Sequence, residues 1–162
     1  MTVYVSDASI FILIIRHQLV QAFFNFTKQV LTSNLVWEEL NAEQKLYLSP
    51  YCSSGQLCIE YLQQIDLSQF SNRLSAADCS MILLAVNRNG ILLTNDRLMK
   101  SNAQKQSIEV HGFLWIIEQL YRTAYLSKIE VIQHLDRCKL DPFVHRNQEL
   151  MNAIHRLIST LN

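Results

Sequence analysis

Short apolar runs alternate with longer segments of helical periodicity along this chain. The runs are rich in aliphatic and β-branched residues, which is typical of short buried strands. The predicted strands cover residues 3–5, 29–32, 91–94 and 108–110. The predicted helices cover residues 10–25 with a break near His17, then 35–40, 75–89, 95–106 and 113–126, and two more fill 128–162. This alternation indicates an α/β fold around a parallel sheet.

The segment 75–89 is the clearest of the predicted helices. Ser75 is a capping residue type, apolar side chains follow on nearly every side, and Asn89-Gly90 ends the pattern. A helix that is apolar all round is expected to be buried. The next run, Ile91–Thr94, is almost continuously apolar, as strands of parallel sheets are.

Residues 41–73 give no clear pattern. Residues 49–55 favour a loop, and residues 57–62 fit a strand or a helix, so both alternatives stay open. The chain shows no internal repeat and no linker composition. We therefore expect one domain over residues 1–126, with residues 127–162 as a helical C-terminal extension of that domain.

Composition excludes several classes of protein. Apolar residues make up 49% of the chain and charged residues 17%, so a disordered chain is excluded. The net charge is zero, which excludes the overall basic surface that binds duplex DNA without specificity. The four cysteines form no CxxC pair and are read as idle thiols. The apolar run 10–15 is too short for a bilayer and no basic segment precedes it, so we expect a cytoplasmic protein without membrane contact.

Particular acids stand where strands end or helices begin. Asp7 follows the first predicted strand directly, and Asp96 follows the strand at 91–94. Parallel strands present their carboxyl ends at one edge of a sheet, where ligands bind in open α/β folds. Glu39 lies about two helical turns after the second strand, and Asp78 lies in the first turn of the buried helix. All four acids can therefore face the same edge.

Each acid also has a purely structural explanation. Ser75-Ala76-Ala77-Asp78 fits a capping box, and Asp7 and Asp96 fit N-caps. Glu38-Glu39 fits an exposed acidic pair that the helix dipole favours. The joint pattern favours a shared site, because caps need not all gather at one end of one sheet.

Binding of a divalent cation would explain such clustering of carboxylates. Carboxylates a few ångströms apart repel one another, and bound metal removes that repulsion. Mg²⁺ prefers oxygen ligands and retains several waters. Two such ions, roughly 3.5–4 Å apart, can stabilise the attacking and leaving oxygens of an in-line displacement at phosphorus. The predicted metal ligands and catalytic residues are Asp7, Glu39, Asp78 and Asp96.

Five stretches of the chain carry a resemblance to a known family. They are Val5–Ser9, Val36–Leu40, Leu74–Asp78, Leu92–Arg97 and Val110–Gly112. In this order they resemble the motifs of PIN-domain nucleases, in particular the VapC toxins of bacterial toxin–antitoxin pairs. The resemblance covers residues 3–126, and the ordered set with a Thr-Asn-Asp-Arg turn after an apolar strand is fairly specific.

The resemblance implies a fold and an activity. The fold would be a three-layer α/β/α arrangement with a central parallel sheet, here with extra C-terminal helices. The activity would be that of an endoribonuclease that depends on Mg²⁺ or Mn²⁺ and hydrolyses RNA phosphodiesters with metal-activated water. Family members are usually homodimers, and a small antitoxin protein holds them inactive by blocking the cleft.

The resemblance also assigns roles to residues. The family's four acids fall on Asp7, on the Glu before Leu40, on Asp78 and on Asp96. The second of these is Glu39, with Glu38 as the alternative. Supporting positions beside the site fall on Ser6, Thr94 and Asn95.

Two basic residues follow the last acid. Arg97 and Lys100 can meet RNA phosphates beside the cleft, or form a solvated helix face.

A non-catalytic PIN-like module that binds RNA or protein is the main alternative function. A phosphoryl-accepting or phosphatase domain is less favoured, because no lysine immediately follows Val110 and Asp7 has no acidic neighbour within two residues.

Overall fold

A five-stranded parallel sheet forms the centre of the first of two structural units. The computed structural model describes residues 1–162, which divide into Met1–Phe113 and Leu114–Asn162. The strand order is β3-β2-β1-β4-β5. The strands are β1 (Tyr4–Ser6), β2 (Val30–Ser33), β3 (Leu57–Glu60), β4 (Ile91–Leu93) and β5 (Val110–His111). The predicted parallel α/β sheet is confirmed, and residues 57–60, which were open between strand and helix, form a strand.

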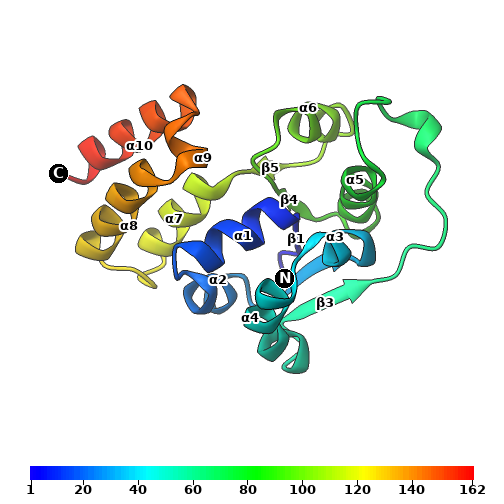
Figure 1. The fold of residues 1–162 in the computed structure, drawn as a ribbon, viewed down its shortest axis with the longest axis horizontal. Coiled ribbons are helices and arrows are strands. Elements are labelled where there is room, and N and C mark those ends of the chain that lie inside the picture. The colour runs from blue at the N-terminus through cyan, green and yellow to red at the C-terminus, as the bar shows by residue number, and fades with distance from the viewer. The chain divides into compact units, whose positions relative to one another are not determined.

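Helices cover both faces of this sheet. They are α1 (Ala8–Arg16), α2 (Val20–Thr27), α3 (Asn34–Glu39), α4 (Ala42–Ser53), α5 (Ala76–Arg88), α6 (Arg97–Lys105) and the short 3₁₀ helix η1 (Leu67–Gln69). Figure 1 shows α5 and α6 on one side of the strands and α1, α2 and α4 on the other, while α3 contacts both α1 and α5. Right-handed crossovers produce this division, because the chain first moves outward from β1 to β3 and then returns through β4 to β5. The three-layer α/β/α arrangement is therefore confirmed.

Several boundaries follow from local sequence. The predicted break near His17 is confirmed, since α1 ends at Arg16 and Gln18 adopts a positive φ of 59° before α2 begins. At the other end of the sheet, α5 stops where Asn89 takes the left-handed conformation that commonly ends helices. Observed strands differ from the predicted ones by about one or two residues.

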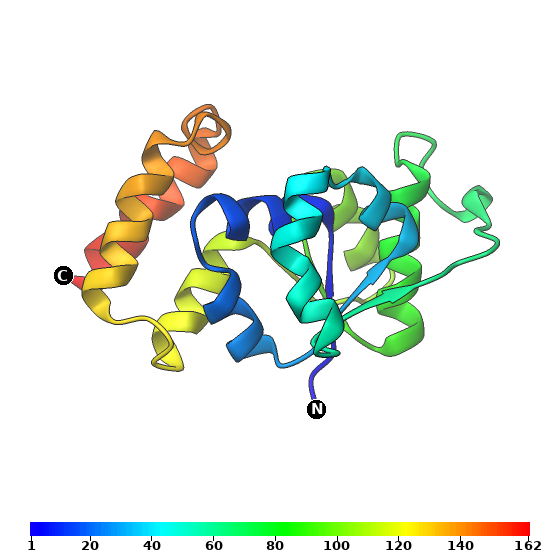
Figure 2. The same cartoon turned by 60° about the horizontal axis from the view of Figure 1, so that its bottom comes forward.

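The expected loop at residues 49–55 is wrong, because α4 continues to Ser53 and contains Pro50. A capping box between Asn41 and Gln44 starts this helix. In its last turns the ring of Tyr51 stacks on Phe24 of α2, with 4.1 Å between ring centroids. This contact and the intact cap outweigh the unfavourable proline. Beyond β3, residues 61–75 form the extended connection to α5 that Figure 2 shows.

The second unit is helical. Its helices are α7 (Phe113–Arg122, which begins at the boundary), α8 (Lys128–Leu140), α9 (Pro142–His145) and α10 (Gln148–Leu161), and Figure 2 shows α8 and α10 side by side. Residues 128–162 thus hold three helices, whereas two were expected. Asp141 ends α8 and caps α9 by accepting a hydrogen bond from the Phe143 N–H at 2.9 Å, and Pro142 suits the first helical position. None of the helices of either unit combines the length and apolar character needed to cross a bilayer.

Candidate metal-binding site

The candidate site lies where the order of strands reverses. The chain leaves β1 towards β3 and returns on the other side of β1 as β4, so the carboxyl ends of β1 and β4 border a topological switch point. Ligands of open α/β sheets bind at such a point. Asp7 follows β1 directly, and its backbone N–H donates a hydrogen bond to the Leu93 carbonyl of β4 at 3.2 Å. The first predicted acid therefore stands at the switch point itself.

Asp7 is a buried carboxylate with several hydrogen-bond donors around it. The residue is 7% exposed and caps α1. Oδ1 accepts from the Ile10 N–H at 3.1 Å and from Ser9 Oγ at 2.7 Å, and Oδ2 accepts from Thr94 Oγ1. Burial, with a smaller contribution from the charge of Asp78, raises the pKa of Asp7 to about 6 against the effect of these hydrogen bonds. None of the groups that shift this pKa is a cation.

Asp78 combines a capping role with a place in the acidic group. Ser75 Oγ accepts from the Asp78 N–H at 3.0 Å, and Asp78 Oδ2 accepts from the Ser75 N–H at 2.9 Å, so the predicted capping box is present. The charge of Asp78 also raises the pKa of both Asp7 and Glu39. The half-buried Asp78 therefore lies within electrostatic range of acids that come from two other elements.

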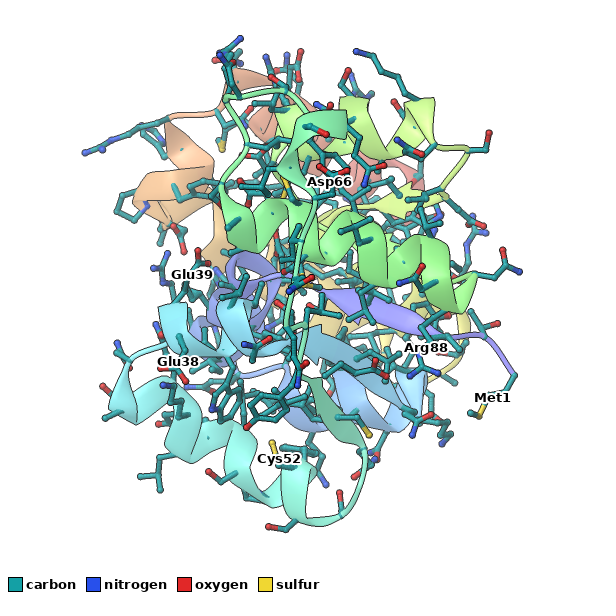
Figure 3. The ribbon with its side chains drawn as sticks, turned by 90° about the vertical axis from the view of Figure 1, so that its right-hand side faces the viewer. Met1, Glu38, Glu39, Cys52, Asp66 and Arg88 are labelled. Atoms are coloured by element: carbon teal, nitrogen blue, oxygen red, sulfur yellow. The ribbon has the colours of Figure 1, made fainter.

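The structure distinguishes Glu39 from Glu38. Burial and then the charge of Asp78 raise the pKa of Glu39. Glu38 instead pairs with Lys45 of α4 at 3.7 Å and is 74% exposed. Figure 3 shows the two side chains on opposite sides of α3, with Glu39 towards α5 and Glu38 towards α4. Both side chains are exposed, and Glu39 is the one whose pKa responds to the charge of Asp78.

The backbone of Asp96 is connected to Asp7 through a threonine, while its exposed side chain points to the start of α6. Asp96 caps α6, where its Oδ1 accepts from the Met99 N–H at 2.7 Å. Its own N–H donates to Thr94 Oγ1 at 3.1 Å, and the same hydroxyl donates to Asp7. The buried Thr94 side chain thus connects the carboxylate of Asp7 to the backbone of Asp96.

The other two supporting residues hold backbone in place. Ser6 is fully buried, and its Oγ donates to the Asp7 carbonyl at 3.3 Å. Asn95 Oδ1 accepts from the Phe113 N–H at 3.0 Å, and a Cβ atom on Gly112 would lie only 2.6 Å from this oxygen. Asn95 therefore connects the turn after β4 to the turn after β5, and a side chain at position 112 would displace the Asn95 amide from this hydrogen bond.

The donor set fits a hard divalent cation with much of its water retained. The charge of Asp78 raises the pKa of both Asp7 and Glu39. The Thr94 hydroxyl bonds to the Asp7 carboxylate and to the Asp96 backbone. No group of three or more His, Cys, Asp or Glu side chains is close enough to hold one ion together. Mg²⁺ does not need such a cage, because one or two carboxylates and several waters suffice. Oxygen donors without His or Cys suit Mg²⁺ or Mn²⁺.

Hydrogen bonds between several hydroxyl groups near the site and distant parts of the chain were missed in the sequence. Ser33 and Ser80 bond to one another, and Thr32 Oγ1 donates to the Ser6 carbonyl at 2.9 Å. Ser9 Oγ likewise donates to Asp7 Oδ1 at 2.7 Å. The one available signal was Ser80, a polar residue inside an otherwise apolar run of α5.

Comparison with known proteins agrees with this architecture. A family model described as "DUF3368: PIN domain" matches residues 3–159. A solved PilT N-terminus domain protein from Sulfolobus solfataricus is similar with a TM-score of 0.51 and 11% identity, over 78% of this chain and 97% of that one. A domain of a functionally unknown protein from Methanocaldococcus jannaschii is similar with a TM-score of 0.50 and 18% identity, over 70% and 91%. No curated protein matches the sequence. At these identities the solved structures support the fold alone.

Proposed function

The chain belongs to the PIN domain family, and on this premise we propose that it is a cytoplasmic endoribonuclease that depends on Mg²⁺ or Mn²⁺. PIN domains are typically nucleases. The observation that carries the proposal is the buried carboxylate of Asp7 at the switch point, whose pKa burial and Asp78 raise. Placing an acid there is unfavourable for the protein alone and favourable once a cation binds.

Each acid has a part in the proposed site. Asp7, held by Thr94, Ser9 and the start of α1, presents a carboxylate of fixed orientation. Asp78 and Glu39 supply further oxygens from α5 and α3, and Asp96 does so from the start of α6. Bound metal would lower the pKa of a water molecule and neutralise charge on the scissile phosphate. The protein's own contribution is to hold the oxygens and to orient the RNA.

Helix α6 is suited to contact the RNA backbone. It begins directly after Asp96 and carries three basic residues and no acidic one, and Arg97 and Lys100 are both exposed. Because the chain has no net charge, this concentration of positive charge is local. We assign the phosphates beside the scissile bond to Arg97 and Lys100.

The proposal predicts that cleavage of RNA requires divalent metal. Purified protein should cleave single-stranded RNA in the presence of Mg²⁺ or Mn²⁺, stop in EDTA, and resume when Mg²⁺ is added in excess. Gel analysis of an end-labelled RNA measures this directly. Cleavage by the wild-type protein that persists in EDTA would refute the metal mechanism.

We extend the proposal to a VapC-like toxin that forms a homodimer and is inhibited by a small antitoxin protein. The support is the order of motifs around the four acids, which resembles that of the VapC toxins. Expression of the chain without an antitoxin should slow bacterial growth, whereas the Asp96→Asn variant should not. Growth curves at equal protein levels test this, and equal harmlessness of both proteins would remove the toxin role.

A second candidate function is a non-catalytic PIN-like module that binds RNA or protein. One observation favours it, because Asp7, Asp78 and Asp96 each cap a helix and so have a structural use. Capping alone, however, does not need a buried charge, since asparagine caps a helix about as well as aspartate. Replacing Asp7 by Asn separates the two functions.

A further inference from the structure

Two serine side chains meet in the interior beside the proposed site. Ser33 and Ser80 are fully buried, and their Oγ atoms lie 2.6 Å apart. Ser80 Oγ is also 2.6 Å from the Ala77 carbonyl, to which it donates its proton. The proton between the two serines therefore comes from Ser33, whose Oγ also accepts from the Val36 N–H at 3.1 Å. Each hydroxyl group therefore donates one hydrogen bond and accepts one.

The pair joins the two helices that carry Glu39 and Asp78. Ser33 ends β2 and is the N-cap of α3, the helix on which Glu39 lies. Ser80 is two residues after Asp78 in α5, and its acceptor Ala77 directly precedes Asp78. The charges of Glu39 and Asp78 interact across the gap between these helices. A side-chain bond thus connects two segments that each carry one of the acids, and the helices α3 and α5 are in contact.

Stability alone does not require a bond between these two hydroxyl groups, although the Ser33 hydroxyl also stabilises α3 as its N-cap. A pair of buried hydroxyl groups that are replaced together by apolar groups of the same shape is nearly neutral for folding. The hydrogen bond does, however, define one distance and one register between α3 and α5, which apolar contacts do not. Such a constraint is useful where two oxygens must be held at a separation that a metal ion can bridge.

We propose that the Ser33–Ser80 pair is a positioning device that fixes the separation of Glu39 and Asp78 and thereby sets the affinity of the site for divalent metal. The inference rests on the proposed function. Neither serine is a catalytic residue, because both lie in the interior and act through the helices that they join.

The chain contains a matched control for this pair. Thr27 is also buried, at 3% exposure, and its Oγ1 donates to the Phe23 carbonyl at 2.9 Å within α2. That hydrogen bond stays inside one helix and joins none of the acid-bearing elements. Thr27→Ala therefore removes a buried hydroxyl bond of similar kind without changing the register of α3 and α5.

The test measures Mg²⁺ binding by thermal stabilisation, without RNA and without activity. We expect Ser80→Ala to raise the Mg²⁺ concentration for half-maximal stabilisation by roughly 10-fold or more, the size of effect that loss of a supporting residue has on metal affinity. Thr27→Ala should leave this concentration within about twofold of wild type. The Ser33→Ala/Ser80→Ala double variant also removes the N-cap of α3, so it should be less stable than Ser80→Ala and should not regain the Mg²⁺ affinity.

The outcomes separate the inference from the proposed function. A wild-type protein that Mg²⁺ does not stabilise would overturn both. A normal wild-type response with equal Mg²⁺ dependence in Ser80→Ala and Thr27→Ala would overturn the positioning role alone. If Ser80→Ala does not fold, Ser80→Cys, whose thiol is a weaker hydrogen-bonding group of similar shape, gives the same comparison, and wild-type Mg²⁺ affinity in it overturns the role as well.

Discussion

Asp7→Asn is expected to lower the rate of Mg²⁺-dependent RNA cleavage by at least about 100-fold. Supporting residues of metal sites typically contribute 10–100-fold, and Asp7 is placed as a direct ligand. The fold should survive, because asparagine can still accept the Ile10 N–H and cap α1. The loss therefore comes from the removed charge rather than from unfolding. Single-turnover cleavage at saturating Mg²⁺ measures it, with circular dichroism as the check on folding.

Glu38 and Glu39 provide a matched comparison for the same assay. Glu39→Gln removes the acid that interacts with Asp78 and should reduce cleavage strongly. Glu38→Gln removes its exposed neighbour, which pairs with Lys45, and should leave cleavage within about twofold, because exposed ion pairs contribute little. If Asp7→Asn cleaves RNA as fast as wild type, the four acids are helix caps and the nuclease proposal fails.

The layered fold was predictable because its signals are local. Continuously apolar runs marked the strands, and Ser75 with Asn89 marked both ends of α5. The helix at residues 49–53 was not predictable, since it depends on the stacking of Tyr51 on Phe24 from another helix. The Ser33–Ser80 bond joins residues 47 positions apart and leaves no periodic trace. Long-range contacts of this kind exist only once the topology has formed.

The positions of the acids at strand ends and helix starts were predictable. Their gathering at one edge of the sheet, however, is not specific to a metal site. In consecutive β–α units, each helix begins at the carboxyl end of the preceding strand. Caps therefore do gather at one edge, as Asp7 and Asp96 illustrate. What sets the group apart is the burial of Asp7 and the effect of the Asp78 charge on the pKa of Glu39, and both are visible only in three dimensions.

In the absence of metal, Asp7→Asn is expected to make the protein more stable at pH 8. The pKa of Asp7 is about 6 in the folded protein against 3.8 for the ordinary group, so the folded state binds more protons between these values. Stability of the wild type therefore rises as the pH falls from about 6 to about 4, and the ionised carboxylate destabilises it above that range. The difference between these two pKa values corresponds to a destabilisation of the folded state on the order of 3 kcal/mol at pH 8. For a domain of this size that is roughly 6–12 °C in Tm.

Thermal unfolding in EDTA from pH 4 to pH 8 checks this expectation. The advantage of Asp7→Asn should be full at pH 8, shrink between pH 6 and pH 4, and vanish near pH 4. Asp66→Asn is the control, because Asp66 also caps a helix but is exposed, and the Ser68 hydroxyl lowers its pKa. That variant should show no gain at pH 8. Excess Mg²⁺ should raise the Tm of the wild type at pH 8 and not that of Asp7→Asn. A variant less stable than wild type at pH 8 would mean that Asp7 serves the fold, and the non-catalytic module would then be the better description.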